Sequence, residues 1–206
     1  MNRRTILIGS ALGALAPLTL FAAEGSAEVG KPAPPFRVTD AEGRERKLSD
    51  FAGKAVLLEW TSPSCPFVRA QYESGVMQDL QRIAAKQGVV WLTILSTHPS
   101  RRDYLPGDKA AAFHRGRGGA SAALLLDPDG TMGKAYGAVV TPQVFIIGSQ
   151  GALVYAGGTG DKSTMDAKEV RASRSFIRAA LEDLAAGRKI ATPTSRPFGC
   201  TIAYRG

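Results

Sequence analysis

Apolar residues along the chain gather in short continuous runs separated by polar turns, a pattern typical of an α/β protein. The runs at residues 55–60 and 89–95 are almost wholly apolar, as expected of strands buried on both faces of a sheet. A further strand is predicted at 122–126. Two more, at 143–147 and 152–155, flank a Gly-Ser-Gln-Gly turn and predict a hairpin.

Helical spacing of apolar side chains predicts the elements between and after these strands. A long helical stretch at 66–86 contains Gly75, which we expect to kink or divide it. Shorter helices are predicted at 109–114 and 132–136. A final amphipathic helix at 166–186 is expected to lie against the sheet.

The N-terminal part of the domain begins with a predicted hairpin, in which residues 36–38 and 46–48 flank a turn at 40–43. Strands that alternate with helices, followed by a hairpin and a helix, predict an α/β sandwich with a mixed central sheet flanked by helices. We expect this domain to occupy residues 28–189. Residues 190–206 contain two prolines and are expected to form an extended C-terminal tail.

The first residues follow the pattern of a secretory signal peptide. A basic start at 2–4 precedes an apolar stretch at 5–21, and Ala23 or Ala27 provides a small-residue cleavage site. Residues 1–27 are therefore predicted to direct export, to the periplasm if the source is bacterial, with no stable membrane insertion after cleavage. The paired arginines also resemble a twin-arginine signal, and an uncleaved anchor is the minority alternative.

The charge balance adds little to this picture. The chain has 26 basic and 18 acidic residues, a net charge of +8. Its basic residues are scattered and form no run interleaved with aromatic residues, so solubility explains them better than nucleic acid binding, and no nucleic acid partner is expected. The two cysteines, Cys65 and Cys200, change the picture more, because an exported chain can keep them as one disulfide.

Cys65 lies where an apolar run ends and a predicted helix begins. Pro66 suits the first helical position, which would make Cys65 the N-cap and expose it to the unpaired amides and positive end of the helix dipole. Such a position favours the thiolate, the nucleophile in disulfide exchange and in peroxide reduction. The alternative is a buried, inert cysteine that packs as a small apolar side chain.

Several segments resemble the peroxiredoxin-like members of the thioredoxin-fold superfamily, in the alkyl hydroperoxide reductase and thiol-specific antioxidant branch. The order of strands, the cysteine at a helix start and Thr141-Pro142 before a hairpin are similar to the thioredoxin-like sandwich, and Pro142 matches its cis-proline. The segments that carry the narrower resemblance are residues 29–36, 48–54, 64–68, 127–130 and 196–202.

The chain departs from both motifs of these relatives. Val68 stands where a thioredoxin-type Cys-x-x-Cys motif has its second cysteine. Ser62 fills the hydroxyl position of the peroxiredoxin motif, but Leu58 stands where that motif has proline. The arginine that such enzymes place beside the thiolate has no clear counterpart, and Arg69 is the candidate.

The resemblance implies a thiol-dependent oxidoreductase without a cofactor or metal. Cys65 would attack a peroxide or a disulfide substrate, Cys200 would resolve the product, and an external thiol reductant would reopen the resulting disulfide. Ser62 would hydrogen-bond the thiolate. The sequence leaves three states open for the two cysteines: a reversible catalytic pair, a permanent structural staple, or two unrelated thiols.

Glu59 precedes Cys65 by six residues, the spacing at which thioredoxin-like proteins often bury an acid as a proton relay. The alternative is a side chain that points to solvent at a strand end. We expect the substrate pocket to involve Trp60, Pro66, Phe67, Thr141 and Pro142, with Trp60 and Phe67 either walling the site or packing in the core. A cis Pro142, as the resemblance implies, would leave the backbone of Thr141 free to pair with an extended substrate or to shape the pocket beside Cys65.

Peroxide reduction is placed slightly ahead of thiol-disulfide exchange on protein substrates. The other function class is a non-catalytic binding or copper-handling domain, in which Cys65, Cys200 and His98 would be the metal ligands. The chain lacks the local pair of cysteines that copper chaperones of this fold use, which counts against a copper site.

Overall fold

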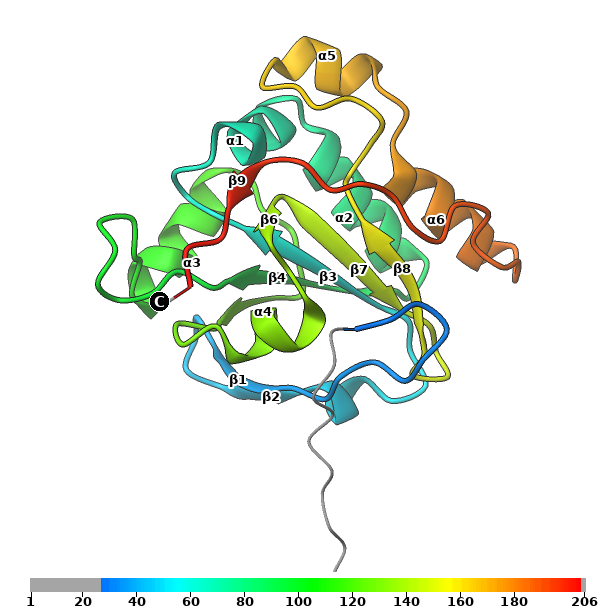
Figure 1. Cartoon of the computed structure of the whole chain (residues 1–206), viewed down its shortest axis with the longest axis horizontal. Coiled ribbons are helices and arrows are strands. Elements are labelled where there is room, and N and C mark those ends of the chain that lie inside the picture. The colour runs from blue at the N-terminus through cyan, green and yellow to red at the C-terminus, as the bar shows by residue number, and fades with distance from the viewer. Residues whose placement is uncertain (1–26, 205–206) are drawn as a thin grey trace, which may run out of the picture.

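The computed structural model describes residues 27–204, which form a seven-stranded mixed sheet with helices on both faces (Figure 1). The strand order is β2-β1-β5-β4-β3-β7-β8. The central strands β3, β4 and β5 are parallel, and the outer strands pair antiparallel. The strands are β1 (Arg37–Asp40), β2 (Glu45–Lys47), β3 (Val56–Thr61), β4 (Val90–Leu95), β5 (Ala123–Leu126), β7 (Gln143–Ile147) and β8 (Leu153–Gly157).

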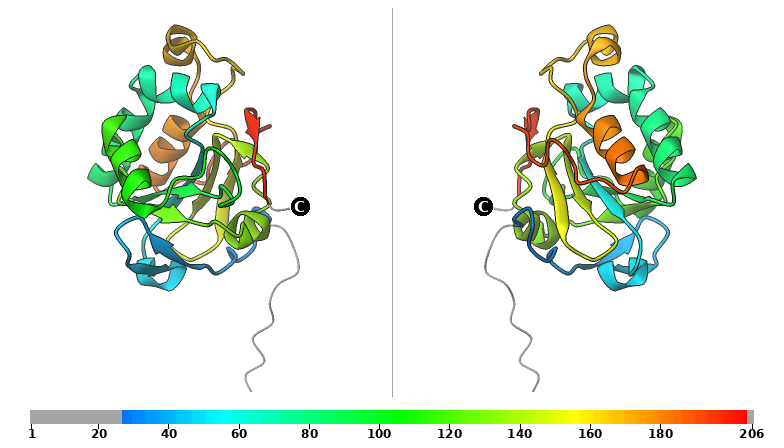
Figure 2. Two further views of the ribbon diagram at one scale, coloured as in Figure 1. Left: turned by 90° about the vertical axis from the view of Figure 1, so that its left-hand side faces the viewer. Right: turned by 90° about the vertical axis from the view of Figure 1, so that its right-hand side faces the viewer.

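The helices divide between the two faces of this sheet (Figure 2). Helices α1, α2, α3 and α6 cover one face, and α4 covers the other together with the N-terminal segment that leads into β1. The helical elements are η1 (Leu48–Phe51), α1 (Pro66–Glu73), α2 (Val76–Lys86), α3 (Gly107–Gly116), α4 (Thr131–Tyr136), α5 (Ala167–Ala172) and α6 (Phe176–Ala185). The predicted α/β sandwich with its N-terminal hairpin is confirmed.

Two helical predictions meet different outcomes. The stretch at 66–86 is divided at Gly75, whose φ of +78° is a conformation that favours glycine. The single final helix predicted at 166–186 is wrong, because the chain leaves helical geometry at Ser173 and restarts at Ser175. The Ser175 hydroxyl accepts a hydrogen bond from the amide of Arg178 at 3.1 Å and so caps α6.

The C-terminal tail forms β structure that the sequence pattern did not predict. Thr194 lies beside Ala156 of the edge strand β8 in a parallel bridge. Further on, β9 (Cys200–Thr201) pairs antiparallel with β6 (Val140–Thr141). The tail therefore runs from α6 across β8 to β6, as the red segment in Figure 1 shows.

The signal peptide predicted at 1–27 lies outside the described residues except for Ala27. Between residues 27 and 204, the helices are all too short or too polar to cross a membrane.

Candidate active site

Cys65 occupies the N-cap of α1, with Pro66 in the first helical position. Its side chain is buried, with 2% of its surface exposed. The thiol donates a hydrogen bond to the carbonyl oxygen of Thr141 at 3.1 Å. The peptide bond from Thr141 to Pro142 is cis, as the family resemblance implies. The start of α1 and the end of β6 thus meet at the Cys65 sulfur.

Cys200 reaches the same place from the C-terminal tail. It is the direct partner of Thr141 in the pairing of β9 with β6. The residue before it, Gly199, has a φ of +140°, and a Cβ atom there would overlap the Thr141 carbonyl. Glycine is therefore required for the tail to approach this closely, which gives the Gly-Cys motif a physical reason.

Both cysteines are free; Cys65 is buried and Cys200 is half-buried. Burial raises the pKa of Cys200 to about 12, and a hydrogen bond to Cys65 and the charge of Cys65 act in the same direction. The backbone amide of Phe67 has a smaller opposing effect on that pKa. Cys200 is therefore a protonated thiol at neutral pH in this arrangement.

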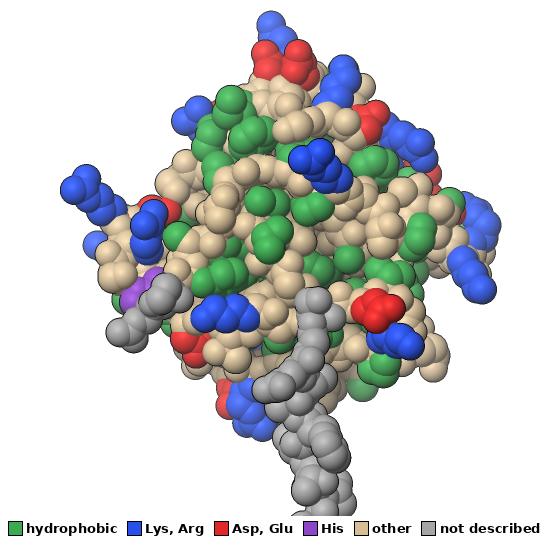
Figure 3. Space-filling view, viewed as in Figure 1, with side chains coloured by type: hydrophobic (Ala, Val, Ile, Leu, Met, Phe, Trp, Pro, Cys, Tyr) green, Lys and Arg blue, Asp and Glu red, His purple; other side chains and the backbone are tan. Residues whose placement is uncertain are grey.

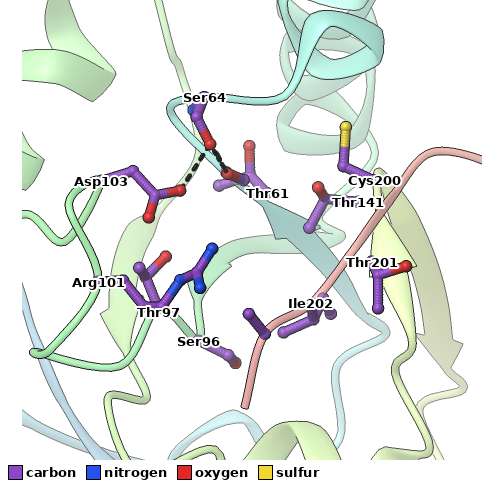
Figure 4. Close-up of a pocket in the computed structure, with 12 residues that line it drawn as sticks. Thr61, Ser64, Ser96, Thr97, Arg101, Asp103, Thr141, Cys200, Thr201 and Ile202 are labelled. Atoms are coloured by element: carbon purple, nitrogen blue, oxygen red, sulfur yellow. Dashed lines mark hydrogen bonds between the residues drawn. The ribbon is translucent and has the colours of Figure 1, made fainter. Parts of the chain in front are cut away.

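A cavity of about 200 Å³ with a mixed polar and apolar lining lies beside Cys200 (Figure 4). Hydroxyl side chains and two opposite charges line part of its wall, and the side chain of Arg101 extends into it. The lining residues are Thr61, Ser62, Ser64, Ser96, Thr97, Arg101, Asp103, Thr141, Cys200, Thr201, Ile202 and Ala203. Cys65 is absent from this lining, so Cys200 is the cysteine that borders the cavity.

Ser62 lines the cavity, but its hydroxyl interacts with Ser64 instead of Cys65. The two hydroxyl oxygens are 3.2 Å apart, and the Ser64 hydroxyl also donates to Asp103 at 2.6 Å. Among residues 27–204 the Ser62 hydroxyl has no hydrogen bond to the Cys65 thiol. Ser62 therefore interacts with Ser64 at the cavity wall. The Cys65 thiol donates its hydrogen bond to Thr141 instead.

Glu59 is fully buried in β3, so the alternative of a solvent-facing side chain is wrong. Its carboxylate accepts hydrogen bonds from Trp91 at 2.9 Å and from Tyr72 at 3.0 Å, with weaker bonds from Gln81 and Thr93 at 3.3 Å. Burial raises the pKa of Glu59, although nearby positive charge and these donors oppose the shift. A buried acid with a raised pKa is suited to holding a proton.

Arg117 supplies that positive charge and was missed in the sequence, where it stood in a Gly-rich segment without a recognisable motif. Its guanidinium carbon lies 3.7 Å from the centre of the Tyr72 ring. It also donates a hydrogen bond to the Thr61 hydroxyl at 3.0 Å. Because Thr61 lines the cavity, Arg117 connects the buried surroundings of Glu59 to the cavity wall.

The expected pocket residues are placed unequally. Thr141 lines the cavity, but its backbone is paired with Cys200 instead of being free for a substrate. Trp60 is wholly buried and packs against Tyr136 and Phe145 on the other face of the sheet, so it belongs to the core. Phe67 packs on a ring of the tail, Phe198, at 6.0 Å between centroids.

The candidate arginine of the sequence, Arg69, lies away from the cavity. Its side chain is 69% exposed and pairs with Glu73 one helical turn later. Arg101 is the arginine that lines the cavity, and no sequence pattern distinguished it from the other loop arginines. In the described part of the chain, no three His, Cys, Asp or Glu side chains are placed to hold a metal ion, so the copper site of Cys65, Cys200 and His98 is not formed.

Known proteins resemble this chain in sequence and in fold. A model of the AhpC/TSA family matches residues 29–156. The thiol-disulfide oxidoreductase ResA of Geobacillus thermodenitrificans is 31% identical over 148 residues, which cover 72% of this chain and 79% of the relative. ResA of Geobacillus kaustophilus is 29% identical over the same shares of the two chains.

Solved structures support the fold. An uncharacterized conserved protein from Geobacillus kaustophilus superposes with a TM-score of 0.71 and 26% identity, over 86% of this chain and 93% of its own. The thioredoxin domain of a thiol-disulfide oxidoreductase from Bacteroides vulgatus gives a TM-score of 0.51 and 19% identity, over 64% and 89%. The family match covers most of the described residues, and the fold agrees with it. This chain therefore belongs to the AhpC/TSA family, as an oxidoreductase with the thioredoxin fold.

Proposed function

We propose that the protein is an exported thiol-disulfide oxidoreductase in which Cys65 and Cys200 form a reversible catalytic disulfide. The observation that carries this proposal is the convergence of both cysteines on Thr141. The Cys65 thiol bonds the Thr141 carbonyl, and Cys200 pairs with the same residue across β6 and β9. The names of the relatives support disulfide exchange ahead of peroxide reduction, which reverses the order expected from the sequence.

The exchange reaction uses the two thiols in sequence. The Cys65 thiolate attacks one sulfur of a substrate disulfide, forming a mixed disulfide and releasing the other half of the substrate as a thiolate. The Cys200 thiol then loses its proton to a leaving thiolate and attacks the Cys65 sulfur. This step forms the Cys65–Cys200 disulfide and releases the second half of the substrate as a thiol. An external thiol reductant returns the protein to the dithiol.

Peroxide reduction is the second candidate, and the size of the site favours it. Cys65 is 2% exposed and the neighbouring cavity holds about 200 Å³, so a small oxidant reaches the sulfur more easily than a folded protein does. The Cys65 thiolate would take one peroxide oxygen and become a sulfenic acid, with an alcohol or water leaving. Attack by Cys200 would then give the same disulfide and one water molecule.

Glu59 acts as a positioning residue in this scheme. Contacts through Tyr72, Arg117 and Thr61 link it to the cavity, and the Cys65 thiol donates its hydrogen bond to Thr141 and not to Glu59. A protonated Glu59 would leave Arg117 with one fewer opposite charge in the core. The proton relay predicted for Glu59 would therefore act on the cavity wall and not directly on the sulfur.

The proposed location follows from the N-terminal sequence alone, where residues 1–27 have the pattern of a signal peptide. The surface agrees with a small thiol or disulfide partner better than with nucleic acid. Figure 3 shows basic side chains spread over the face in view with acidic ones among them, and no continuous basic patch on that face.

The test compares the wild type with Cys65→Ser and Cys200→Ser, each fully reduced and then exposed to oxidised glutathione or to hydrogen peroxide. Intact mass spectrometry follows the products. We expect the wild type to lose two hydrogens, and Cys200→Ser to stop at a glutathione adduct or a sulfenic acid on Cys65. The faster oxidant identifies the reaction. If Cys65 reacts no faster than free cysteine with either oxidant, the proposal is wrong.

A further inference from the structure

The cavity beside Cys200 has two side chains of opposite charge on one wall. Arg101 extends into it, and none of the ion pairs between residues 27 and 204 includes Arg101. Asp103 lies close by in the same loop and accepts a hydrogen bond from the Ser64 hydroxyl at 2.6 Å. An unpaired guanidinium beside a carboxylate that is held in place suits a ligand with both signs of charge.

The size of the cavity restricts that ligand. About 200 Å³ is below the range of roughly 300 to 1,000 Å³ that is typical for drug-sized ligands. At about 30 Å³ for each water molecule, it holds the volume of roughly seven waters. An amino acid or one end of a short peptide fits this volume, and the hydroxyl groups of Ser62 and Thr97 offer further polar contacts.

The position of Cys200 determines the chemistry. Cys200 lines the cavity, whereas Cys65 is buried and does not. When the two cysteines are joined, Cys200 is the half of the disulfide that borders the cavity, so we expect a thiol that enters the cavity to attack the Cys200 sulfur. Attack there releases Cys65, which lies at the helix N-terminus, as the leaving thiolate.

We propose that this cavity binds the external reductant, a low-molecular-weight thiol that carries an α-ammonium and a carboxylate, and directs it to Cys200. The carboxylate bonds Arg101 and the ammonium bonds Asp103. The first thiolate forms a mixed disulfide with Cys200 as the Cys65–Cys200 bond breaks. A second thiolate attacks the ligand sulfur, releases Cys200 as a thiol and leaves as the oxidised dimer. The inference rests on the proposed function and specifies its electron donor.

The test measures the rate at which four thiols reduce the Cys65–Cys200 disulfide in the full chain, followed by intact mass after an acid quench. Cysteine carries both charges, 3-mercaptopropionate only the carboxylate, cysteamine only the ammonium, and 2-mercaptoethanol neither. Each rate is divided by the wild-type rate for the same thiol, so that intrinsic reactivity cancels. The variants are Arg101→Gln, Asp103→Asn and, as the matched control for loss of one positive charge, Arg102→Gln.

We expect Arg101→Gln to slow cysteine and 3-mercaptopropionate by about three- to tenfold and to leave the other two thiols unchanged. Asp103→Asn keeps an acceptor for Ser64 and is expected to slow cysteine and cysteamine by a similar factor. Arg102→Gln should leave all four rates unchanged. This result would show that losing one positive charge elsewhere in the loop does not by itself slow the reductants.

Other patterns overturn the inference. If the ratio of variant rate to wild-type rate is the same for all four thiols, or if neither variant changes any rate, Arg101 and Asp103 do not distinguish reductants by their charge. If 2-mercaptoethanol reduces the wild-type disulfide and the rate ratios are equal for the four thiols, only this inference fails. If the wild type forms no Cys65–Cys200 disulfide at all, the proposed function fails and this inference fails with it.

Discussion

Thr141 pairs directly with Cys200 across β6 and β9, and its carbonyl accepts the hydrogen bond of the Cys65 thiol at 3.1 Å. One residue thus contacts two cysteines that are 135 positions apart in the sequence. The contact depends on a tail that arrives from the far edge of the sheet. The stability of that tail therefore controls the chemistry of the pair.

Gly199→Ala should separate the two cysteines. The new Cβ would overlap the Thr141 carbonyl in a backbone conformation that non-glycine residues avoid. We expect the Cys65–Cys200 disulfide to become less stable by roughly 1–3 kcal/mol in a glutathione redox buffer. Gly116→Ala is the control, because nothing lies within 4 Å of its Cβ position and its φ is not positive. Equal redox equilibria in the two variants would contradict this role of Gly199.

Ser195→Ala should loosen the tail upstream of Cys200. The Ser195 hydroxyl accepts a hydrogen bond from the Gly158 amide at 2.9 Å and lies 2.7 Å from the Tyr155 hydroxyl. Its loss leaves the Gly158 amide without this partner, at a cost of about 1–3 kcal/mol to the docked tail. In a Cys65→Ser background, iodoacetamide should then alkylate Cys200 faster. The same reaction in Ser149→Ala, an exposed turn position, should proceed at the parent rate.

Arg117→Gln should raise two pKa values at once. The positive charge of Arg117 lowers the pKa of Glu59 against the larger effect of burial, and it adds to the burial that lowers the pKa of His114. Its removal should move both titrations to higher pH. Carboxyl and imidazole NMR signals measure them directly. Arg115→Gln, in the last turn of α3, is the control and should move neither; an unchanged Glu59 titration in Arg117→Gln would show that the two charges are not coupled.

The pH dependence of stability should carry a contribution from His114. Burial, with help from Arg117, lowers its pKa from 6.5 to about 4. As the pH falls from 6.5 to 4, the unfolded chain therefore takes up a proton that the folded chain does not, and stability falls by up to about 3 kcal/mol. Above pH 6.5 the ring is neutral in both states and the contribution is constant.

His114→Asn should lose less stability than the wild type between pH 6.5 and 4 in urea unfolding, whatever its stability at neutral pH. His98→Asn, which alters a surface ring bonded to Ser100, is the control and should keep the wild-type slope. Glu59 contributes with the opposite sign, since a raised pKa means that stability falls as the pH rises through it, but this contribution is common to all three proteins. Parallel curves for His114→Asn and wild type would refute the assignment.

Most strands and helices could be predicted because each is specified by the residues within it or next to it. The apolar runs of β3 and β4 can be satisfied only in the middle of a sheet, and Pro66 after Cys65 predicts a helix start. The break at Ser173 was missed because apolar side chains continue at helical spacing on both sides of it. The capping serine at 175, which accepts from a backbone amide, was the available signal.

The candidate site was predictable only in part. The sequence identified Cys65, Cys200 and the segment at Thr141 through motif and resemblance, but not their geometry. Arg101 and Arg117 lie in loops, where no periodicity indicates the direction of a side chain. Their positions depend on how those loops pack, and so no reading of the sequence separated them from the exposed Arg69.

The sequence by itself determined the thioredoxin-like class, the N-cap position of Cys65 and the presence of a second cysteine in a glycine-marked tail, because each depends on residues adjacent in the chain. Only the tertiary structure decided that Cys200 pairs with Thr141, that Glu59 is buried and that a charged cavity adjoins Cys200. These features join segments far apart in the sequence. Their geometry follows from sheet order and from packing of the tail, which local preferences do not specify.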